Sequence, residues 1–414
     1  MGVMRSLVLL VVAGCSFSTT ISNGDGVVGD GAPIDSPRVR PPEGPCGTSG
    51  AISDDFADAQ PARIWAVTGK NGLVESGGTL AVTPMITEFS GYHSTPYVDL
   101  RESSAEVEIR SMVTAGTGAI AFFRFTNGTG LFGISISDDM ISMGVAPSQI
   151  LTLPYDPVAH RHLRVAHAGS TLAFSTSPDG LVWTQLHTAP APPFASTVSI
   201  GLGATNPKAS PSPGTVTFAD FNTYVAPAKW CAVQTLSDNF DDSMIDLPWA
   251  HHGHTTTGCT EYENQFAARV DQNGSLACDA YFGTSALYAL TDSNMVVRIA
   301  AITTYTTGWI TYFGAWDVDE QNRARMYFED NQMCADGTGI TKTCVAYSTT
   351  RDLWRIREAA GMLYFETASS TANQFTAVLA VPTPFPMEAV RVYFGTLTDR
   401  AVGQNIGLNV DRFN

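Results

Sequence analysis

The chain contains an internal repeat, which constrains its fold more than any other feature of the sequence. Residues 164–183 are similar to residues 355–367, with matched positions a constant 191 apart (356 − 165). The matched apolar pairs are Val165 and Ile356, Leu172 and Leu363, and Phe174 and Phe365. A stretch that recurs at this distance predicts two domains of the same kind.

The repeated stretch has the pattern of a β-hairpin. Leu172 and Phe174 alternate with the small residues Ala173 and Ser175, which places the large side chains on one face of a half-buried strand. The preceding Ala-Gly-Ser at 168–170 allows a tight reversal. We therefore expect sheets here and not helices.

Further matches extend the repeat to most of the chain. Separations are 184 for the opening segments (238 − 54) and 192 for the closing ones (413 − 221). The opening residues Asp54, Phe56, Asp58 and Trp65 match Asp238, Phe240, Asp242 and Trp249, and the closing pair Phe221-Asn222 matches Phe413-Asn414. The change in separation predicts an insertion in the second copy, which we expect between Cys334 and Cys344. The predicted domains are residues 46–228 and 229–414.

Composition favours an exported all-β protein. Charged residues make up only 15% of the chain, Gly and Pro are frequent, and the formal net charge is −16. This charge argues against nucleic acid as a partner. Repeats of about 170 residues exceed an immunoglobulin domain and fit two tandem antiparallel jelly-roll β-sandwiches.

Four features resemble the bacterial concanavalin A-like lectin/glucanase superfamily, including its laminin-G-like members. They are the opening Asp-Asp/Asn-Phe followed by Trp, a central Leu-Arg-Val strand, the turn from Ser177 through Pro178, Asp179 and Gly180 to Trp183, and the closing Phe-Asn. The resemblance implies jelly-roll domains that bind glycan or another extracellular partner. It gives Asp179 the role of hydrogen-bonding turn amides.

The N-terminus has the pattern of a bacterial lipoprotein signal. One cation, Arg5, precedes an apolar run at 7–12 that is too short to span a bilayer. The following Val12-Ala13-Gly14-Cys15 resembles a lipobox, which implies lipid on Cys15; the alternative is an ordinary cleaved signal in which Cys15 is incidental. Ser16 after the cysteine favours the outer membrane of a bacterial envelope.

A polar segment separates this signal from the first domain. Residues 16–45 are rich in Gly, Asp, Pro, Ser and Thr and hold few large apolar side chains. Such a segment cannot bury enough surface to offset the entropy of ordering its backbone. We expect a disordered tether, with the membrane reached only through the lipid anchor.

The six cysteines after Cys15 are an even number, as expected for an oxidising compartment. Because first and last strands of a jelly roll usually lie side by side, Cys46 is expected to pair with Cys231. Local pairing is expected for Cys259 with Cys278 and for Cys334 with Cys344. Metal ligation is the competing interpretation, although no CxxC spacing is present.

Two kinds of ligand site are considered. The candidates for sugar stacking are the aromatic residues Tyr305, Trp309, Tyr312 and Trp316. Calcium is a possible cofactor, with Asp54, Asp220, Asp238 and Asp411 as candidate ligands; solvated turn-capping acids are the alternative.

Catalysis is a competing hypothesis. Asp317, Asp319 and Glu320 could act as the carboxylates of a glycoside hydrolase, although no second matching strand is apparent. His251, His252 and His254 with Glu261 and Glu263 could bind a transition metal or form a polar loop.

We expect a non-enzymatic, lipid-anchored surface protein that binds glycan or an extracellular partner; a purely structural or adhesive role is the third possibility.

Overall fold

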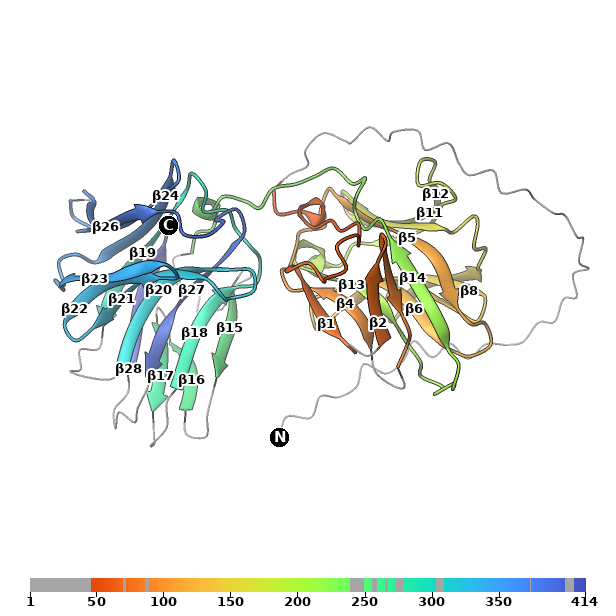
Figure 1. Ribbon diagram of the computed structural model, residues 1–414, viewed down its shortest axis with the longest axis horizontal. Helices are drawn as coiled ribbons and strands as arrows, with labels where there is room; N and C mark the ends of the chain where they lie inside the picture. Colours follow the sequence, from red (N-terminus) through yellow and green to blue (C-terminus); the bar gives the residue numbers. More distant parts are fainter. Residues whose placement is uncertain are drawn as a thin grey trace, which may run out of the picture.

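The computed structural model describes residues 46–69, 72–85, 89–238, 249–254, 259–264, 267–272, 278–302, 309–372, 374–398 and 406–414. They form two tandem antiparallel jelly-roll β-sandwiches, which confirms the predicted fold class (Figure 1). The helices in this part are short 3-10 turns, η1 (Ser49–Ala51), η3 (Pro193–Ser196) and η4 (Val233–Thr235). Within the same residues, no helix has the length and apolar character needed to cross a membrane.

The first sandwich consists of two seven-stranded sheets, here named front and back. The front sheet has, in spatial order, β1 (Trp65–Thr68), β4 (Ser90–Ser94), β13 (Ser199–Thr205), β6 (Ile120–Thr126), β7 (Leu131–Ser137), β8 (Met140–Val145) and β9 (Gln149–Pro154). The back sheet has β12 (Thr184–Pro190), β11 (Thr171–Ser177), β10 (His162–Ala168), β5 (Ser104–Val113), β14 (Gly214–Ala219), β3 (Thr79–Val82) and β2 (Leu73–Ser76).

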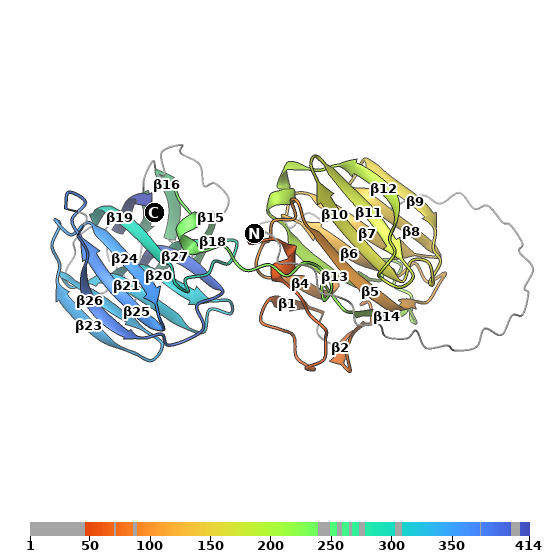
Figure 2. The same cartoon turned by 90° about the horizontal axis from the view of Figure 1, so that it is seen from above.

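The second sandwich repeats this arrangement. Its front sheet has β15 (Trp249–His254), β18 (Cys278–Thr284), β27 (Val390–Thr398), β20 (Trp309–Asp317), β21 (Arg323–Glu329), β22 (Gln332–Gly337) and β23 (Ile340–Ala346). Its back sheet has β16 (Cys259–Asn264), β17 (Ala267–Gln272), β28 (Ile406–Phe413), β19 (Asn294–Ile302), β24 (Leu353–Ala359), β25 (Met362–Ala368) and β26 (Thr376–Pro382). Figure 2 shows the two sheets of each sandwich stacked face to face.

Strand pairing places the insertion of the second copy near its start. Trp65 pairs with Ser94 and Trp249 with Thr284, so Ser94 and Thr284 are equivalent and 190 apart (284 − 94). The separation therefore grows from 184 to 190 between β15 and β18. The expected insertion between Cys334 and Cys344 is wrong, because this segment is the β22–β23 hairpin and matches β8–β9 of the first sandwich.

Alternating side chains build the cores. On β6 the exposure alternates, with Phe123 and Phe125 fully buried between the sheets and Phe122 and Arg124 half-buried on the outer side. Leu172 and Phe174 are fully buried, as their alternation predicts. The second sandwich buries its counterparts Leu363 and Phe365 equally.

The opening and closing segments of each sandwich lie side by side. Backbone bridges join Asp54 to Phe221 in the first and Asp238 to Phe413 in the second. The closing asparagine reinforces this contact: Asn222, at φ 53°, accepts a hydrogen bond from the Glu106 amide at 2.8 Å. Its Nδ2 donates to the carbonyl oxygens of Ser49 and Ile52, both at 2.9 Å.

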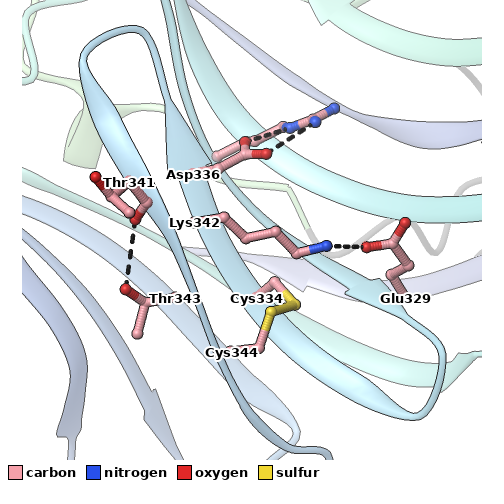
Figure 3. Close-up of a disulfide and its surroundings, with 8 residues drawn as sticks. Glu329, Cys334, Asp336, Thr341, Lys342, Thr343 and Cys344 are labelled. Atoms are coloured by element: carbon pink, nitrogen blue, oxygen red, sulfur yellow. Dashed lines mark hydrogen bonds and ion pairs between the residues drawn. A yellow bond between two sulfur atoms is a disulfide. The ribbon is translucent and has the colours of Figure 1, made fainter.

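Two of the three expected disulfides fall within the described side chains. Cys46 is bonded to Cys231 across 185 residues, with the Cα atoms 4.8 Å apart. Cys334 is bonded to Cys344 across neighbouring strands of the β22–β23 hairpin (Figure 3). The side chains of Cys259 and Cys278 lie outside the described part, so their pairing stays a prediction.

Hydrogen bonds and an ion pair join the two sandwiches near the Cys46–Cys231 bridge. The Tyr97 amide donates to the Ser285 carbonyl at 3.1 Å. The Arg391 guanidinium donates to the carbonyl oxygen of Thr95 at 2.9 Å, and Arg63 lies 3.7 Å from the carboxylate of Asp317. These polar contacts bring the end of β4 next to the second sandwich.

Candidate functional site

The outer side of the first front sheet carries a cluster of one arginine and three aromatic rings. The Arg124 guanidinium carbon lies 4.2 Å from the centre of the Phe89 ring and 4.7 Å from that of Phe122. The two phenylalanine rings are stacked, 5.1 Å apart, and the His93 ring is 6.5 Å from Phe89. We call Phe89, His93, Phe122 and Arg124 the arginine cluster.

Glycines allow this cluster to lie flat on the sheet. Gly201 faces Arg124 on the neighbouring strand, and a Cβ there would lie 3.1 Å from the arginine Nε. A Cβ on Gly203 would come within 2.6 Å of the Phe89 ring. Substitution of either glycine would therefore push the cluster away from the sheet.

On the side of Arg124 away from Gly201, the next two residues paired across the sheet are glycines, which leave a strip of backbone without side chains. Gly133 pairs with Arg124, and Gly144 pairs with Gly133 on the next strand. Both glycines have positive φ, 154° and 143°, which other residues rarely adopt. This part of the sheet therefore exposes backbone, whereas the guanidinium itself lies on the Gly201 side of β6.

The cluster is positively charged, and its sheet supplies no countercharge. The seven strands of the first front sheet, all within the described residues, contain neither Asp nor Glu. Burial lowers the pKa of Arg124 to about 10, so the guanidinium remains charged at neutral pH. Burial, together with the charge of Arg124, lowers the pKa of His93 below its usual 6.5, which favours a neutral imidazole.

The second front sheet carries tyrosines at the rows of Phe122 and Arg124 and a tryptophan, Trp316, one outward row further along β20. Trp316 packs edge-on against Tyr393 at 4.9 Å and lies 5.6 Å from Tyr312. Tyr281 packs edge-on against Tyr393 at 5.2 Å. Tyr312, Tyr327 and Tyr393 are buried, whereas Trp316 and Tyr281 are half-exposed. We call these five residues the aromatic cluster.

The two front faces differ most at the glycine strip of the first, where the second carries charged side chains. Arg325 and Asp336 of β21 and β22 occupy the positions of Gly133 and Gly144, and their side chains form an ion pair at 2.7 Å. In Figure 3, Asp336 lies on the same hairpin as the Cys334–Cys344 disulfide. The disulfide itself replaces a hydrogen bond between the hydroxyls of Ser142 and Thr152 in the first sandwich.

The structure brings two of the four predicted sugar-stacking residues together. Trp316 and Tyr312 are neighbours in the aromatic cluster, but Tyr312 is buried and exposes little of its ring. Trp309 begins β20, but its side chain is outside the described part, and Tyr305 is outside it entirely. Trp316 is therefore the candidate best placed to meet a ligand.

The predicted carboxylate cluster lies at the end of β20, and each of its acids has a partner. Asp317 accepts hydrogen bonds from the backbone amide of Asn322 at 2.9 Å and from its side chain at 2.6 Å. Asp319 lies 3.6 Å from Arg63. Glu320 accepts a hydrogen bond from the Tyr393 hydroxyl at 2.5 Å, and burial and this bond raise the pKa of Tyr393. These contacts indicate that the three acids stabilise a turn and the contact between the two sandwiches.

The predicted calcium ligands do not converge in the part described. Asp54 accepts hydrogen bonds from the Phe56 amide at 2.8 Å and the Trp65 indole at 2.7 Å, and Asp220 lies 3.6 Å from Arg110. Asp238 makes a backbone bridge to Phe413, and the side chain of Asp411 is not described. No group of three or more His, Cys, Asp or Glu suited to a metal occurs among the described residues. Calcium binding stays a prediction.

The histidines and glutamates of the second proposed metal site lie on described strands, but nothing is described of their side chains. His251, His252 and His254 are on β15, and Glu261 and Glu263 on β16, in opposite sheets of the sandwich. Transition-metal binding therefore stays a prediction as well.

Sequence reasoning missed the arginine cluster. Its only signal was Arg124 at an outward position of the otherwise apolar β6 sequence IAFFRFT. An outward arginine normally indicates a solvated face. The glycines that make this one different come from β7, β8 and β13, and only the strand register brings them beside it.

Comparison with known proteins gives limited structural similarity. No protein-family profile matches the chain, and no curated protein matches it in sequence. Among solved structures, Crh5 transglycosylase is similar over 43% of this chain and 82% of its own, at 13% identity and a TM-score of 0.33. The β-glucanase of Bacillus licheniformis is similar over 43% and 97%, at 10% identity and a TM-score of 0.32. A legume lectin-like domain from Entamoeba histolytica is similar over 40% and 88%, at 10% identity and a TM-score of 0.31. Similarity at this level assigns no activity, so function must be argued from the residues of the two front faces.

Proposed function

We propose that the protein is a non-enzymatic glycan-binding protein whose front faces contact sugar rings. The observation that carries this proposal is that both front sheets have a cluster of aromatic rings on the outer side of the same central strands. Half-exposed rings held in place by neighbouring rings offer flat, rigid apolar surfaces with little entropy left to lose on binding. The C–H faces of pyranose rings are complementary to such surfaces.

Among the described residues, the aromatic rings on the outer side of the back sheets stack on arginines that are themselves paired with acids. The outward arginines of these sheets are paired with glutamates, as Arg164 is with Glu106 at 2.7 Å and Arg355 with Glu366 at 2.7 Å. These ion pairs give the back faces a charged, internally satisfied surface. The contrast between the faces supports binding at the front.

Glycoside hydrolysis is the second candidate, and the carboxylates support it less well. Retaining hydrolysis requires two carboxyl groups about 5 Å apart on either side of the scissile bond. The first front sheet has no acid on its strands. In the second, Asp317, Glu329 and Asp336 are bonded to Asn322, Lys342 and Arg325, respectively.

A glycan array with a matched pair of tryptophan variants tests the proposal. We expect the protein to bind a subset of glycans, and Trp316→Ala to weaken binding at the second face about 10-fold, since an aromatic contact contributes about 0.5–1.5 kcal/mol beyond buried area. Trp183→Ala, which removes a ring stacked on Arg164 of the back sheet, should leave binding unchanged. Equal losses in both variants, or no glycan bound with or without calcium, would contradict the proposal.

We also propose that Cys15 carries a lipid that attaches the protein to the outer membrane through the tether at 16–45. The lipobox-like Val12-Ala13-Gly14-Cys15 supports this attachment. Cys15→Ala should shift the protein from the detergent phase to the aqueous phase in a detergent partitioning experiment. A variant that partitions like the wild type would show that Cys15 is not the anchor.

A further inference from the structure

Arginines stacked on aromatic rings recur in this protein, and each of the others within the described residues also has a carboxylate. Arg164 lies 3.8 Å from the centre of the Trp183 ring and is paired with Glu106. The same combination of ring and acid holds for Arg325 with Tyr327 and Asp336, for Arg355 with Phe375 and Glu366, and for Arg357 with Tyr364 and Glu366. The ring and the carboxylate together hold the guanidinium in one orientation.

Arg124 has the rings but, among the residues that the structure describes, no carboxylate. It lies against both the Phe89 and Phe122 rings, yet within the described residues its guanidinium makes neither an ion pair nor a hydrogen bond. Its Nε is buried without a hydrogen-bond partner. A charged donor in this state costs stability, because it has lost water and gained no acceptor.

The second sandwich has an ion pair at two positions where the first has glycines. At the rows of Gly133 and Gly144, it carries its own arginine and acid, Arg325 and Asp336. In the first sandwich the positive charge sits one strand away, on Arg124, and no acid follows it. Arg124 is thus the only Asp, Glu, Lys or Arg on the strands of the first front sheet, whereas the second front sheet pairs its arginine with an acid.

We propose that the arginine cluster binds an oxyanion of an acidic glycan, a carboxylate or sulfate group, which pairs with the Arg124 guanidinium beside the Phe89 and Phe122 rings. Phe89 and Phe122 would contact the sugar ring that bears the anion. The neutral imidazole of His93 would supply a hydrogen bond without competing for the charge. This inference rests on the proposed function and gives the first face a ligand class different from that of the aromatic cluster.

Calorimetric titration of the full-length protein with three sets of oligosaccharides tests the inference. The sets are carboxylated oligogalacturonates, sulfated heparin-derived oligosaccharides and neutral β-glucan oligosaccharides of matched length. The carboxylated and sulfated arms distinguish the two oxyanions. Arg124→Gln removes the charge, Arg124→Lys keeps it without the planar donor pair, and Arg101→Gln removes a charge of an exposed arginine paired with Asp99 as a matched control.

We expect at least one acidic set to bind the wild type, and Arg124→Gln to weaken this binding about 10- to 100-fold, the effect of losing a hydrogen bond to a charged group. Arg124→Lys should recover part of the affinity, and Arg101→Gln should change it little. Binding of neutral oligosaccharides should be the same in all variants. Arg124→Gln should also melt no earlier than the wild type, because the arginine contributes no ion pair to the fold.

Three results would overturn the inference, and the first two separate it from the proposed function. In the first, neutral oligosaccharides bind, acidic ones bind no better, and Arg124→Gln leaves the affinity unchanged. This result would support glycan binding and rule out the oxyanion site. If no oligosaccharide of any set binds, both fall. An Arg124→Gln variant that unfolds with the loss of several degrees in melting temperature would show that the arginine serves the fold.

Discussion

Replacing Asn222 by Ala should destabilise the first sandwich by about 3 kcal/mol. The Asn222 side chain joins three backbone groups from two segments: the amide of Glu106 on β5 and the carbonyl oxygens of Ser49 and Ile52 in the opening segment. Ser49 and Ile52 are fully buried, so water cannot replace the lost bonds. Asn222 also sits at φ 53°, where Ala is less well tolerated than Asn.

A second asparagine provides the matched control for this prediction. Asn206 is equally buried, but its side chain bonds only to the backbone of Ser210, four residues away. Asn206→Ala should therefore cost less, about 2 kcal/mol for two local hydrogen bonds. Urea unfolding of both variants gives the comparison, and equal losses would contradict the role assigned to Asn222.

An asparagine makes the equivalent hydrogen bonds in the second sandwich. Asn414 accepts from the Val296 amide at 2.8 Å, and its Nδ2 donates to the carbonyl oxygens of Val233 and Leu236 at 3.0 and 2.7 Å. The repeated Phe-Asn of the sequence is thus the residue pair that ties the opening segment to the sheet. Its recurrence was visible in the sequence, but its hydrogen bonds were not.

Removal of the Cys46–Cys231 disulfide should have the other large effect. The bridge closes a loop of 185 residues that contains the whole first sandwich. In the chain-entropy model, such a loop raises the free energy of unfolding by about 5 kcal/mol, against about 3 kcal/mol for the 10-residue loop between Cys334 and Cys344. Cys46→Ser with Cys231→Ser should therefore lower the melting temperature of the first sandwich and spare the core of the second.

Calorimetry of the two paired cysteine variants measures this difference. Cys334→Ser with Cys344→Ser should shift only the transition of the second sandwich. If loss of the Cys46–Cys231 bridge leaves the first transition in place, the long loop does not stabilise the native state as the entropy argument requires.

The repeat predicted most of the fold because its apolar residues are those that fill the cores. Val165, Leu172 and Phe174 are fully buried, as are their counterparts in the second copy. The positions of Cys46 and Cys231 before the two repeats predicted their disulfide, because the opening and closing segments of a jelly roll are neighbours. The position of the insertion was misjudged because sequence separations were compared only at distant anchor points.

The candidate site was less accessible to sequence reasoning. Aromatic residues of β20 alternate between the core and the outer face, and nothing in the sequence distinguishes fully buried Phe313 from half-exposed Trp316. The arginine cluster depends on Gly133, Gly144 and Gly201, which lie on three strands and meet Arg124 only through the sheet register. That no carboxylate among the described residues pairs with Arg124 can be seen only in the assembled face.

A crystal structure of the protein with the glycan that binds most tightly on the array tests recognition by the front faces most directly. We expect sugar rings on the outer side of a front sheet, against Phe89 and Phe122 in the first sandwich or Trp316 and Tyr281 in the second. A glycan bound on a back sheet, or only at loops away from both clusters, would contradict the account.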